Sequence, residues 1–136
     1  MAKKILSLLL FVGAVALFSI TVLGSDSPKI SPEDAAALVR EGKAILIDVR
    51  EPAEWTSTGV AAPALLLAKS DFDGTQAAWK PFLATVDKET TVVLYCRSGN
   101  RSGKLAAILA QQGFKVANAG GLTDWQKAGL PIRKIE

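Results

Sequence analysis

Two short, unbroken apolar runs constrain the fold more than any other feature of this sequence. Residues 44–47 read Ala-Ile-Leu-Ile, and residues 91–95 read Thr-Val-Val-Leu-Tyr. Runs of this length without polar alternation are typical of strands buried on both faces, as in parallel sheets. Parallel strands need long crossover connections, which are usually helices. We therefore expect one parallel sheet with helices packed over it.

The segments around these runs supply the helices. Ser31-Pro32-Glu33-Asp34 combines an N-cap serine, a proline at the first helical position and two acids in the first turn, and Gly42 can end the helix. Further helices are expected at residues 52–56, 74–86 with a bend at Pro81, 102–112 and 122–128, and further strands at 64–68 and 114–118. This alternation predicts an α/β fold, with a central parallel sheet covered by helices on both faces in three layers.

The first 24 residues differ in composition from the rest. Lys3 and Lys4 precede an apolar run from Ile5 to Leu23, which ends in the small residues of Val22-Leu23-Gly24. This layout is typical of a cleaved signal peptide, although the run approaches the roughly 20 residues of an uncleaved membrane anchor. We predict a leader at 1–24 and a folded domain at 25–136. The domain is expected to be exported, either periplasmic or anchored to the outer face of the inner membrane.

Charge and rare residues exclude several kinds of function. The formal net charge is +3, and the two leader lysines contribute most of it, so the domain is nearly neutral and no nucleic-acid partner is expected. Membrane contact is expected only if the leader stays uncleaved. The absence of histidine excludes Ser-His-Asp triads, Cys-His pairs and His-ligated zinc. The single cysteine, Cys96, excludes intramolecular disulfides and multi-Cys metal sites.

Cys96 itself is a candidate nucleophile. It directly follows the run at 91–95, and ligands of open parallel sheets bind beyond the carboxyl ends of the strands. Gly99 and Asn100 can take positive φ angles, so successive N–H groups can turn inward as an anion-binding nest. Arg97, Arg101 and the following helix N-terminus add positive charge, which favours the thiolate. The alternative, a small buried core cysteine, would need neither the arginines nor the glycine.

Three segments together resemble the rhodanese family. They are Leu46-Ile47-Asp48-Val49-Arg50-Glu51, Cys96-Arg97-Ser98-Gly99-Asn100-Arg101-Ser102 and Asn118-Ala119-Gly120-Gly121-Leu122, the last followed by Trp125, Gly129, Pro131 and Ile132. The resemblance runs from about Ile30 to Ile132. With its leader, the chain is most similar to small, exported, single-domain rhodaneses of the phage-shock type.

The resemblance implies a thiosulfate sulfurtransferase. The Cys96 thiolate would take a sulfane sulfur from thiosulfate or a related small anionic donor, release sulfite, and pass the persulfide sulfur to cyanide or a thiol. Arg97, Ser98, Gly99, Asn100 and Arg101 would bind the donor. Asp48, Arg50 and Ser102 would support the loop, although Asp48 and Arg50 could instead form a surface ion pair. The resemblance implies no cofactor and no metal, and we expect a monomer.

Two alternatives and one departure from the family remain. Related phosphatases of the cell-cycle type place five residues between cysteine and arginine, whereas four separate Cys96 from Arg101, so phosphatase chemistry is less favoured. A non-catalytic sulfur carrier or protein-docking module stays open. Rhodaneses usually continue with His-Ile-x-Gly-Ala where this chain has Val60-Ala61-Ala62-Pro63-Ala64, which leaves the local turn and the pocket rim undetermined. Trp55, Trp79 and Trp125 are expected to pack in the core or at the rim, and Gly120-Gly121 to form a tight turn.

Overall fold

The structure is a computed structural model that describes residues 27–136. The predicted leader at residues 1–24 therefore lies outside the described residues. Within the described part of the chain, no helix has both the length and the apolar character needed to cross a membrane.

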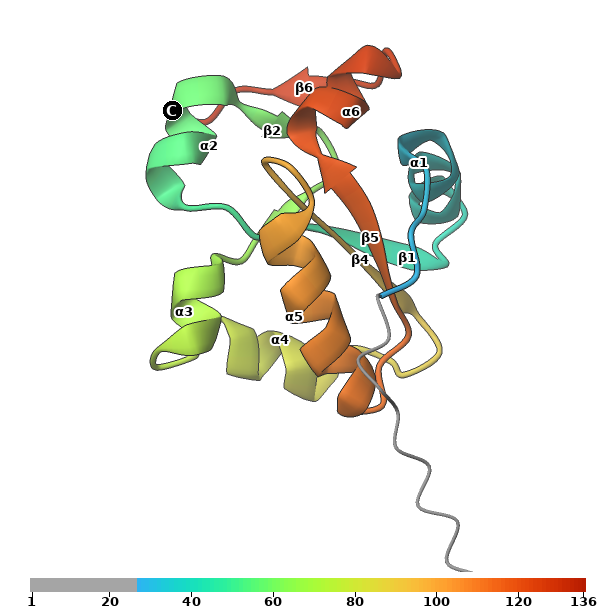
Figure 1. The fold of residues 1–136 in the computed structure, drawn as a ribbon, viewed down its shortest axis with the longest axis vertical. Coiled ribbons are helices and arrows are strands. Elements are labelled where there is room, and N and C mark those ends of the chain that lie inside the picture. The colour runs from blue at the N-terminus through green and yellow to red at the C-terminus, as the bar shows by residue number, and fades with distance from the viewer. Residues whose placement is uncertain (1–26) are drawn as a thin grey trace, which may run out of the picture.

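Four strands form one parallel sheet, as the apolar runs predict. The strands are β1 (Ala44–Asp48), β3 (Leu65–Leu66), β4 (Thr91–Cys96) and β5 (Val116–Gly121), in the order β3-β1-β4-β5 (Figure 1). All three pairings are parallel. The two central strands, β1 and β4, are the two unbroken apolar runs, because a central strand is covered on both faces and gains from apolar side chains throughout.

Helices cover both faces of the sheet. On one face, α1 (Pro32–Arg40) and α6 (Leu122–Lys127) share a core cluster with β1, β4 and β5, which includes the 2% exposed Trp125. On the other face, α3 (Lys69–Asp73), α4 (Trp79–Thr85) and α5 (Asn100–Gln111) share a second cluster, which includes the fully buried Trp79. The predicted three-layer α/β fold is confirmed. So is the expectation that these two tryptophans pack in the core.

The helix expected at residues 74–86 is shorter in the structure, because α4 begins only at Trp79 and ends at Thr85. The carboxylate of Asp71 accepts the backbone N–H groups of Ala77, Ala78 and Trp79 at 2.9–3.1 Å, which caps the start of α4 from the preceding helix. Gln76 takes a positive φ of 58°. The chain therefore turns at residues 74–78, and α3, which the sequence did not predict, ends before that turn.

Element boundaries differ elsewhere near the cysteine loop. The helix expected from residue 102 begins at Asn100, so Asn100 is helical and only Gly99 in the loop takes a positive φ, of 95°. The strand expected at 114–118 is displaced to Val116–Gly121, so Gly120 and Gly121 end a strand instead of forming a tight turn after it. The strand expected at 64–68 shortens to the two residues of β3.

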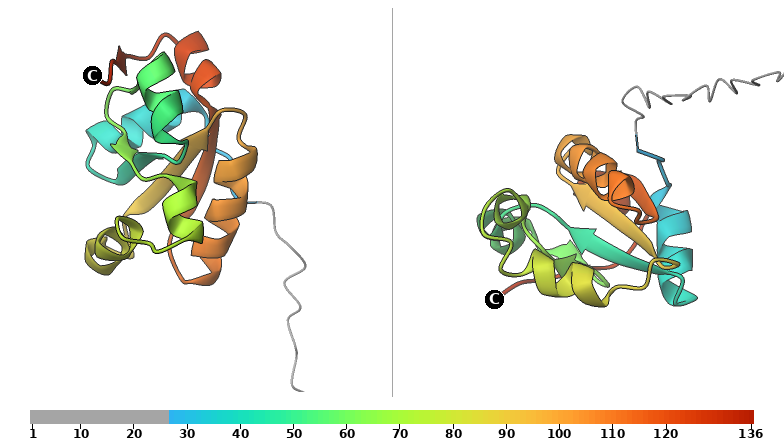
Figure 2. Two further views of the ribbon diagram at one scale, coloured as in Figure 1. Left: turned by 90° about the vertical axis from the view of Figure 1, so that its left-hand side faces the viewer. Right: turned by 90° about the horizontal axis from the view of Figure 1, so that it is seen from below.

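A second, two-stranded sheet was not expected from the sequence. β2 (Val60–Ala61) pairs antiparallel with β6 (Ile132–Arg133), and both residues of β2 are fully buried. The divergent segment at residues 60–64 therefore forms this strand and the turn after it. The small sheet lies beside α2 (Pro52–Thr58) and α6, at the end of the molecule toward which β4 and β5 run (Figures 1 and 2).

Candidate active site

Cys96 is the last residue of β4 and is fully buried. The loop after it turns at Gly99, whose left-handed conformation directs its own N–H to the Cys96 Sγ at 3.0 Å. The hydroxyl oxygen of Ser102, in the first turn of α5, lies 3.3 Å from the same sulfur. Thus the sulfur receives polar contacts from the loop and from the helix that follows it.

These contacts favour the ionised sulfur. Burial acts to raise the pKa of Cys96, but the Ser102 hydroxyl and the backbone N–H groups of Ser102, Ser98 and Gly99 outweigh it, so the pKa lies below the usual value for cysteine. An inert core cysteine would show the effect of burial alone. Cys96 packs in the core, and the N–H and hydroxyl groups that face its sulfur favour the thiolate over the thiol.

The end of β5 forms the floor of the loop. Asn118 Nδ2 donates to the carbonyl oxygen of Gly99 at 2.9 Å. A Cβ atom on Gly121 would collide with the carbonyl oxygen of Arg97, and one on Gly99 would lie 3.2 Å from the Cα of Gly120. Glycines here are therefore required by the close approach of loop and strand. Sequence reasoning did not place Asn118 among the site residues, although an asparagine before two glycines at a strand end was a visible signal.

The two loop arginines have different surroundings. Arg101 forms two hydrogen bonds of 2.7 Å with the carboxylate of Glu54 on α2. This pairing lowers the pKa of Glu54 to about 2 and raises the pKa of Arg101. Arg97 is exposed, and among residues 27–136 it has no ion-pair partner. Arg97 therefore presents a free positive charge at the loop, whereas the charge of Arg101 is balanced.

Asp48 and Arg50 form a buried ion pair, so a surface ion pair is the wrong interpretation. Their side chains are 0% and 3% exposed, and Arg50 Nη2 lies 2.8 Å from Asp48 Oδ2. Arg50 also donates to the Thr58 hydroxyl and the Gly59 carbonyl, both at 2.9 Å, at the end of α2. Half-buried Trp55 donates to Asp48 at 3.0 Å. The pair thus holds α2, and α2 in turn carries the Glu54 that binds the cysteine loop.

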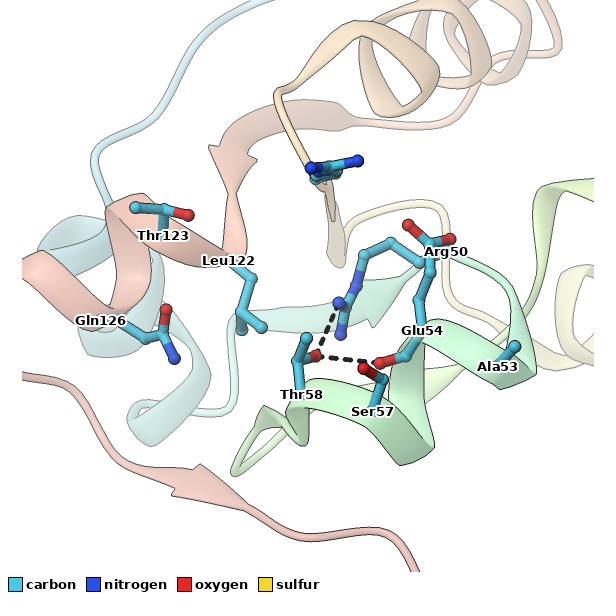
Figure 3. A pocket seen from close by; sticks show the side chains of 9 residues that line it. Arg50, Ala53, Glu54, Ser57, Thr58, Leu122, Thr123 and Gln126 are labelled. Carbon is cyan, nitrogen blue, oxygen red and sulfur yellow. Dashed lines mark hydrogen bonds between the residues drawn. The ribbon is translucent and has the colours of Figure 1, made fainter.

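Within residues 27–136, pockets lie on two sides of the loop. One of about 430 Å³ lies between α2 and α6 and has Arg97 on its wall. Figure 3 shows Ser57 and Thr58 of α2 on one side of this pocket and Thr123 and Gln126 of α6 on the other. The second pocket, of about 380 Å³, is bounded by Ser98 and Gly99 of the loop and by residues that include Lys29 and Asp124. The loop is therefore bordered by space in which small molecules can approach.

The structure thus has a parallel α/β sheet with a cysteine at the end of a central strand and a following loop whose N–H group faces the sulfur. Residues 31–128 match the family described as the Rhodanese-like domain. This chain belongs to the rhodanese family.

Known proteins similar to this chain include sulfurtransferases. The thiosulfate sulfurtransferase GlpE of Actinobacillus succinogenes is 31% identical over 106 residues, covering 76% of this chain and 88% of that protein. A sulfurtransferase of Allochromatium vinosum is 38% identical over 91 residues, covering 65% and 77%. The solution structure of the polysulfide-sulfur transferase homodimer of Wolinella succinogenes superposes with a TM-score of 0.66 at 28% identity, covering 83% of this chain and 82% of that one. At the level of the family, the protein is a sulfurtransferase.

Proposed function

We propose that this protein transfers a sulfane sulfur from thiosulfate, or a related small anionic donor such as polysulfide, to cyanide or a thiol through a persulfide on Cys96. The observation that carries the proposal is the contact of the Cys96 sulfur with the Gly99 N–H at 3.0 Å and with the Ser102 hydroxyl at 3.3 Å. The names of the similar proteins, thiosulfate sulfurtransferase and polysulfide-sulfur transferase, supply the donor classes.

In the proposed first step, the Cys96 thiolate attacks the outer sulfur of thiosulfate. The new bond joins Sγ to that sulfur, the S–S bond of thiosulfate breaks, and sulfite leaves with its electron pair. The negative charge of the enzyme then lies on the outer sulfur of the persulfide, where the N–H groups of the loop stabilise it. The Gly99 N–H and the Ser102 hydroxyl favour the thiolate, because they lower the pKa of Cys96, and the proposed mechanism assigns no residue as a general base.

The acceptor completes the cycle. A thiolate or cyanide attacks the outer sulfur, forms a bond to it and breaks its bond to Sγ, which regenerates the Cys96 thiolate. Because Cys96 is fully buried, both steps require a local shift of the loop. Arg97, Ser98 and Asn100 of this loop are exposed. We place the approach of donor and acceptor in the pocket that Arg97 borders, since an exposed guanidinium there attracts anions.

We further propose that the domain is exported and acts as a monomer. The proposal of export is supported by the sequence of residues 1–24, with its two lysines, apolar run and small residues before Ser25. Fractionation of cells that express the full chain tests export, and N-terminal sequencing of the recovered protein distinguishes a cleaved leader from an anchor.

Turnover separates an enzyme from a sulfur carrier or docking module. We expect purified protein to form thiocyanate from thiosulfate and cyanide at a rate that is proportional to enzyme concentration, and Cys96→Ser to abolish it. Wild-type turnover by the Cys96→Ser protein would contradict the mechanism. Negligible turnover with small donors, together with transfer of sulfur from a protein donor onto Cys96, would favour the carrier.

A further inference from the structure

The hydroxyl of Ser102 has two partners but a single proton. Its oxygen lies 2.8 Å from Asn118 Oδ1 and 3.3 Å from Cys96 Sγ, and Ser102 is fully buried. A hydroxyl donates one hydrogen bond and accepts others. It therefore cannot donate to Asn118 and to Cys96 at the same moment.

The acceptor role of Asn118 is fixed by its other contacts. Its Nδ2 donates to the Gly99 carbonyl at 2.9 Å, and its Oδ1 accepts the N–H of Gly120 at 3.1 Å. A flipped amide would set two donors against each other at Gly120 and two acceptors against each other at Gly99. Asn118 Oδ1 thus faces Ser102 as an acceptor only.

We propose that Asn118 and Ser102 form a proton switch that follows the charge on the Cys96 sulfur. When Sγ carries no charge, as a thiol or within the persulfide, the Ser102 proton points to Asn118 Oδ1. When Sγ is a thiolate, the proton turns to Sγ, and Asn118 Oδ1 keeps only the Gly120 N–H. Asn118 is then a positioning residue that acts on the reaction through Ser102.

The role of the switch in catalysis rests on the sulfur transfer proposed above. In each cycle of that reaction, the Ser102 hydroxyl changes its hydrogen-bond acceptor twice. When the Sγ–S bond forms and sulfite leaves, the charge moves to the outer sulfur and the hydroxyl turns to Asn118. When the acceptor removes the outer sulfur, Sγ is a thiolate again and the hydroxyl turns back to it. Asn118 therefore stabilises the states in which Sγ is uncharged and opposes the thiolate, whereas Ser102 favours the thiolate.

A double-mutant cycle isolates the switch from other influences on Cys96. The charged groups around the site are Arg97, the Arg101–Glu54 pair, the Asp48–Arg50 pair at and just after the end of β1, and Asp124, which accepts the Gly121 N–H at 2.8 Å. These groups are the same in wild type, Ser102→Ala, Asn118→Ala and the double variant. Their direct effects on the pKa of Cys96 therefore cancel when the shift caused by Asn118→Ala in the wild-type background is compared with the shift it causes in the Ser102→Ala background.

The readout is the pKa of Cys96, measured from the pH dependence of iodoacetamide alkylation. Ser102→Ala is expected to raise it. Asn118→Ala removes the contacts with Gly99 and Gly120, and this loss shifts the pKa of Cys96 by the same amount whether residue 102 is serine or alanine. Only when Ser102 is present does Asn118→Ala also remove the Ser102–Asn118 hydrogen bond, which stabilises the thiol. The shift caused by Asn118→Ala should therefore be lower, by about 0.5–1 pH unit, in the wild-type background than in the Ser102→Ala background. Equal shifts, or a difference of opposite sign, would overturn the switch.

Asn118→Asp gives a second, independent cycle in case Asn118→Ala fails to fold. Aspartate at position 118 keeps acceptor oxygens toward Ser102, and its negative charge strengthens the hydrogen bond from the Ser102 hydroxyl. This bond stabilises the thiol, so Asn118→Asp should shift the pKa of Cys96 to a higher value in the wild-type background than in the Ser102→Ala background, the reverse of the difference expected for Asn118→Ala. A difference that does not reverse contradicts the proposal. Circular dichroism verifies that each variant is folded. Alkylation needs no sulfur donor, so failure of the switch and failure of sulfur transfer are distinguishable.

Discussion

At the residue scale, the two arginines of the cysteine loop divide their roles. Arg101 is held by the Glu54 carboxylate through two bonds of 2.7 Å, which fixes the first turn of α5 to α2. Arg97 is exposed and borders the larger pocket. Since paired charges attract a third ion weakly, Arg97 is the loop residue expected to dominate the capture of an anionic donor, and Arg101 the residue expected to hold the loop in shape.

Arg97→Ala is therefore expected to raise the KM for thiosulfate by about tenfold or more, with a smaller effect on kcat, because it removes an attraction present before the reaction. Arg97→Lys should recover part of the loss. The KM should also rise with ionic strength in wild type and less so in Arg97→Ala. Lys104→Ala, on the exposed side of α5, is the matched control. An unchanged KM in Arg97→Ala would assign donor binding to other groups.

The Glu54–Arg101 pair also predicts a pH dependence of stability. The pKa of Glu54 falls from 4.5 to about 2 in the folded protein, so the pair's contribution is fully present above pH 4.5 and is lost as the pH falls through about 2. Glu54→Gln should lower the free energy of unfolding by about 1 kcal/mol at pH 7, and the difference from wild type should shrink at low pH. Urea unfolding at several pH values measures this.

Glu89→Gln is the matched control for that experiment, because the Glu89 side chain is 83% exposed in its pair with Lys115. Exposed pairs contribute little, so its unfolding free energy should stay near that of wild type at each pH. A Glu54→Gln protein with the same behaviour would show that the pair does not stabilise the fold.

At the element scale, the two unbroken apolar runs were sufficient to predict β1, β4 and the parallel sheet, because burial on both faces leaves a strong local pattern. Shorter features left no such pattern. The break between α3 and α4 depends on the Asp71 carboxylate capping residues six to eight positions later. β2 and β6 consist of two residues each and pair across the chain. In both cases a residue or strand further along the chain determines the local structure, and the sequence around the affected residues carries no pattern that predicts it.

The close approach of β5 to the cysteine loop makes its own prediction. Gly121→Ala sets a methyl group against the Arg97 carbonyl, and backbone on both sides leaves little room for a shift. We expect a loss of unfolding free energy of about 2 kcal/mol and a loss of sulfurtransferase activity of at least about tenfold, measured by urea unfolding and by thiocyanate formation.

Gly129→Ala is the control for Gly121→Ala, because it adds a Cβ atom at a glycine where no atom would collide with it. Gly129 has a φ of 73°, but a Cβ there would meet nothing within 4 Å. Its alanine variant should lose about 1 kcal/mol of stability from the left-handed conformation and keep its activity. If Gly121→Ala retained full activity, the close packing of β5 against the cysteine loop would not be needed for catalysis.

At the scale of the whole molecule, the site is assembled from four separate parts of the chain. β1 and the residues after it supply the Asp48–Arg50 pair, α2 supplies Glu54, the β4–α5 segment supplies the cysteine loop, and β5 supplies Asn118. The cysteine loop was predictable because its residues are consecutive. The contacts of Arg101 with Glu54 and of Ser102 with Asn118 join residues 47 and 16 positions apart, and only the fold brings them together.

The assembled site also predicts selectivity between sulfur and phosphoryl chemistry. In this chain four residues separate Cys96 from Arg101, and the Arg101 guanidinium, which a bound phosphate would need, is already paired with the Glu54 carboxylate. Hydrolysis of p-nitrophenyl phosphate should therefore be at the level of Cys96→Ser, and hydrolysis dependent on Cys96 would contradict this.

Intact-protein mass spectrometry after incubation with thiosulfate tests the central claim most directly. Cys96 is the single cysteine of the chain, so any added sulfane sulfur must reside there. We predict a mass increase of one sulfur atom, its complete removal by cyanide, and no increase in Cys96→Ser. A wild-type protein that stays unmodified by thiosulfate and by polysulfide, while its thiol still reacts with iodoacetamide, would contradict the persulfide mechanism.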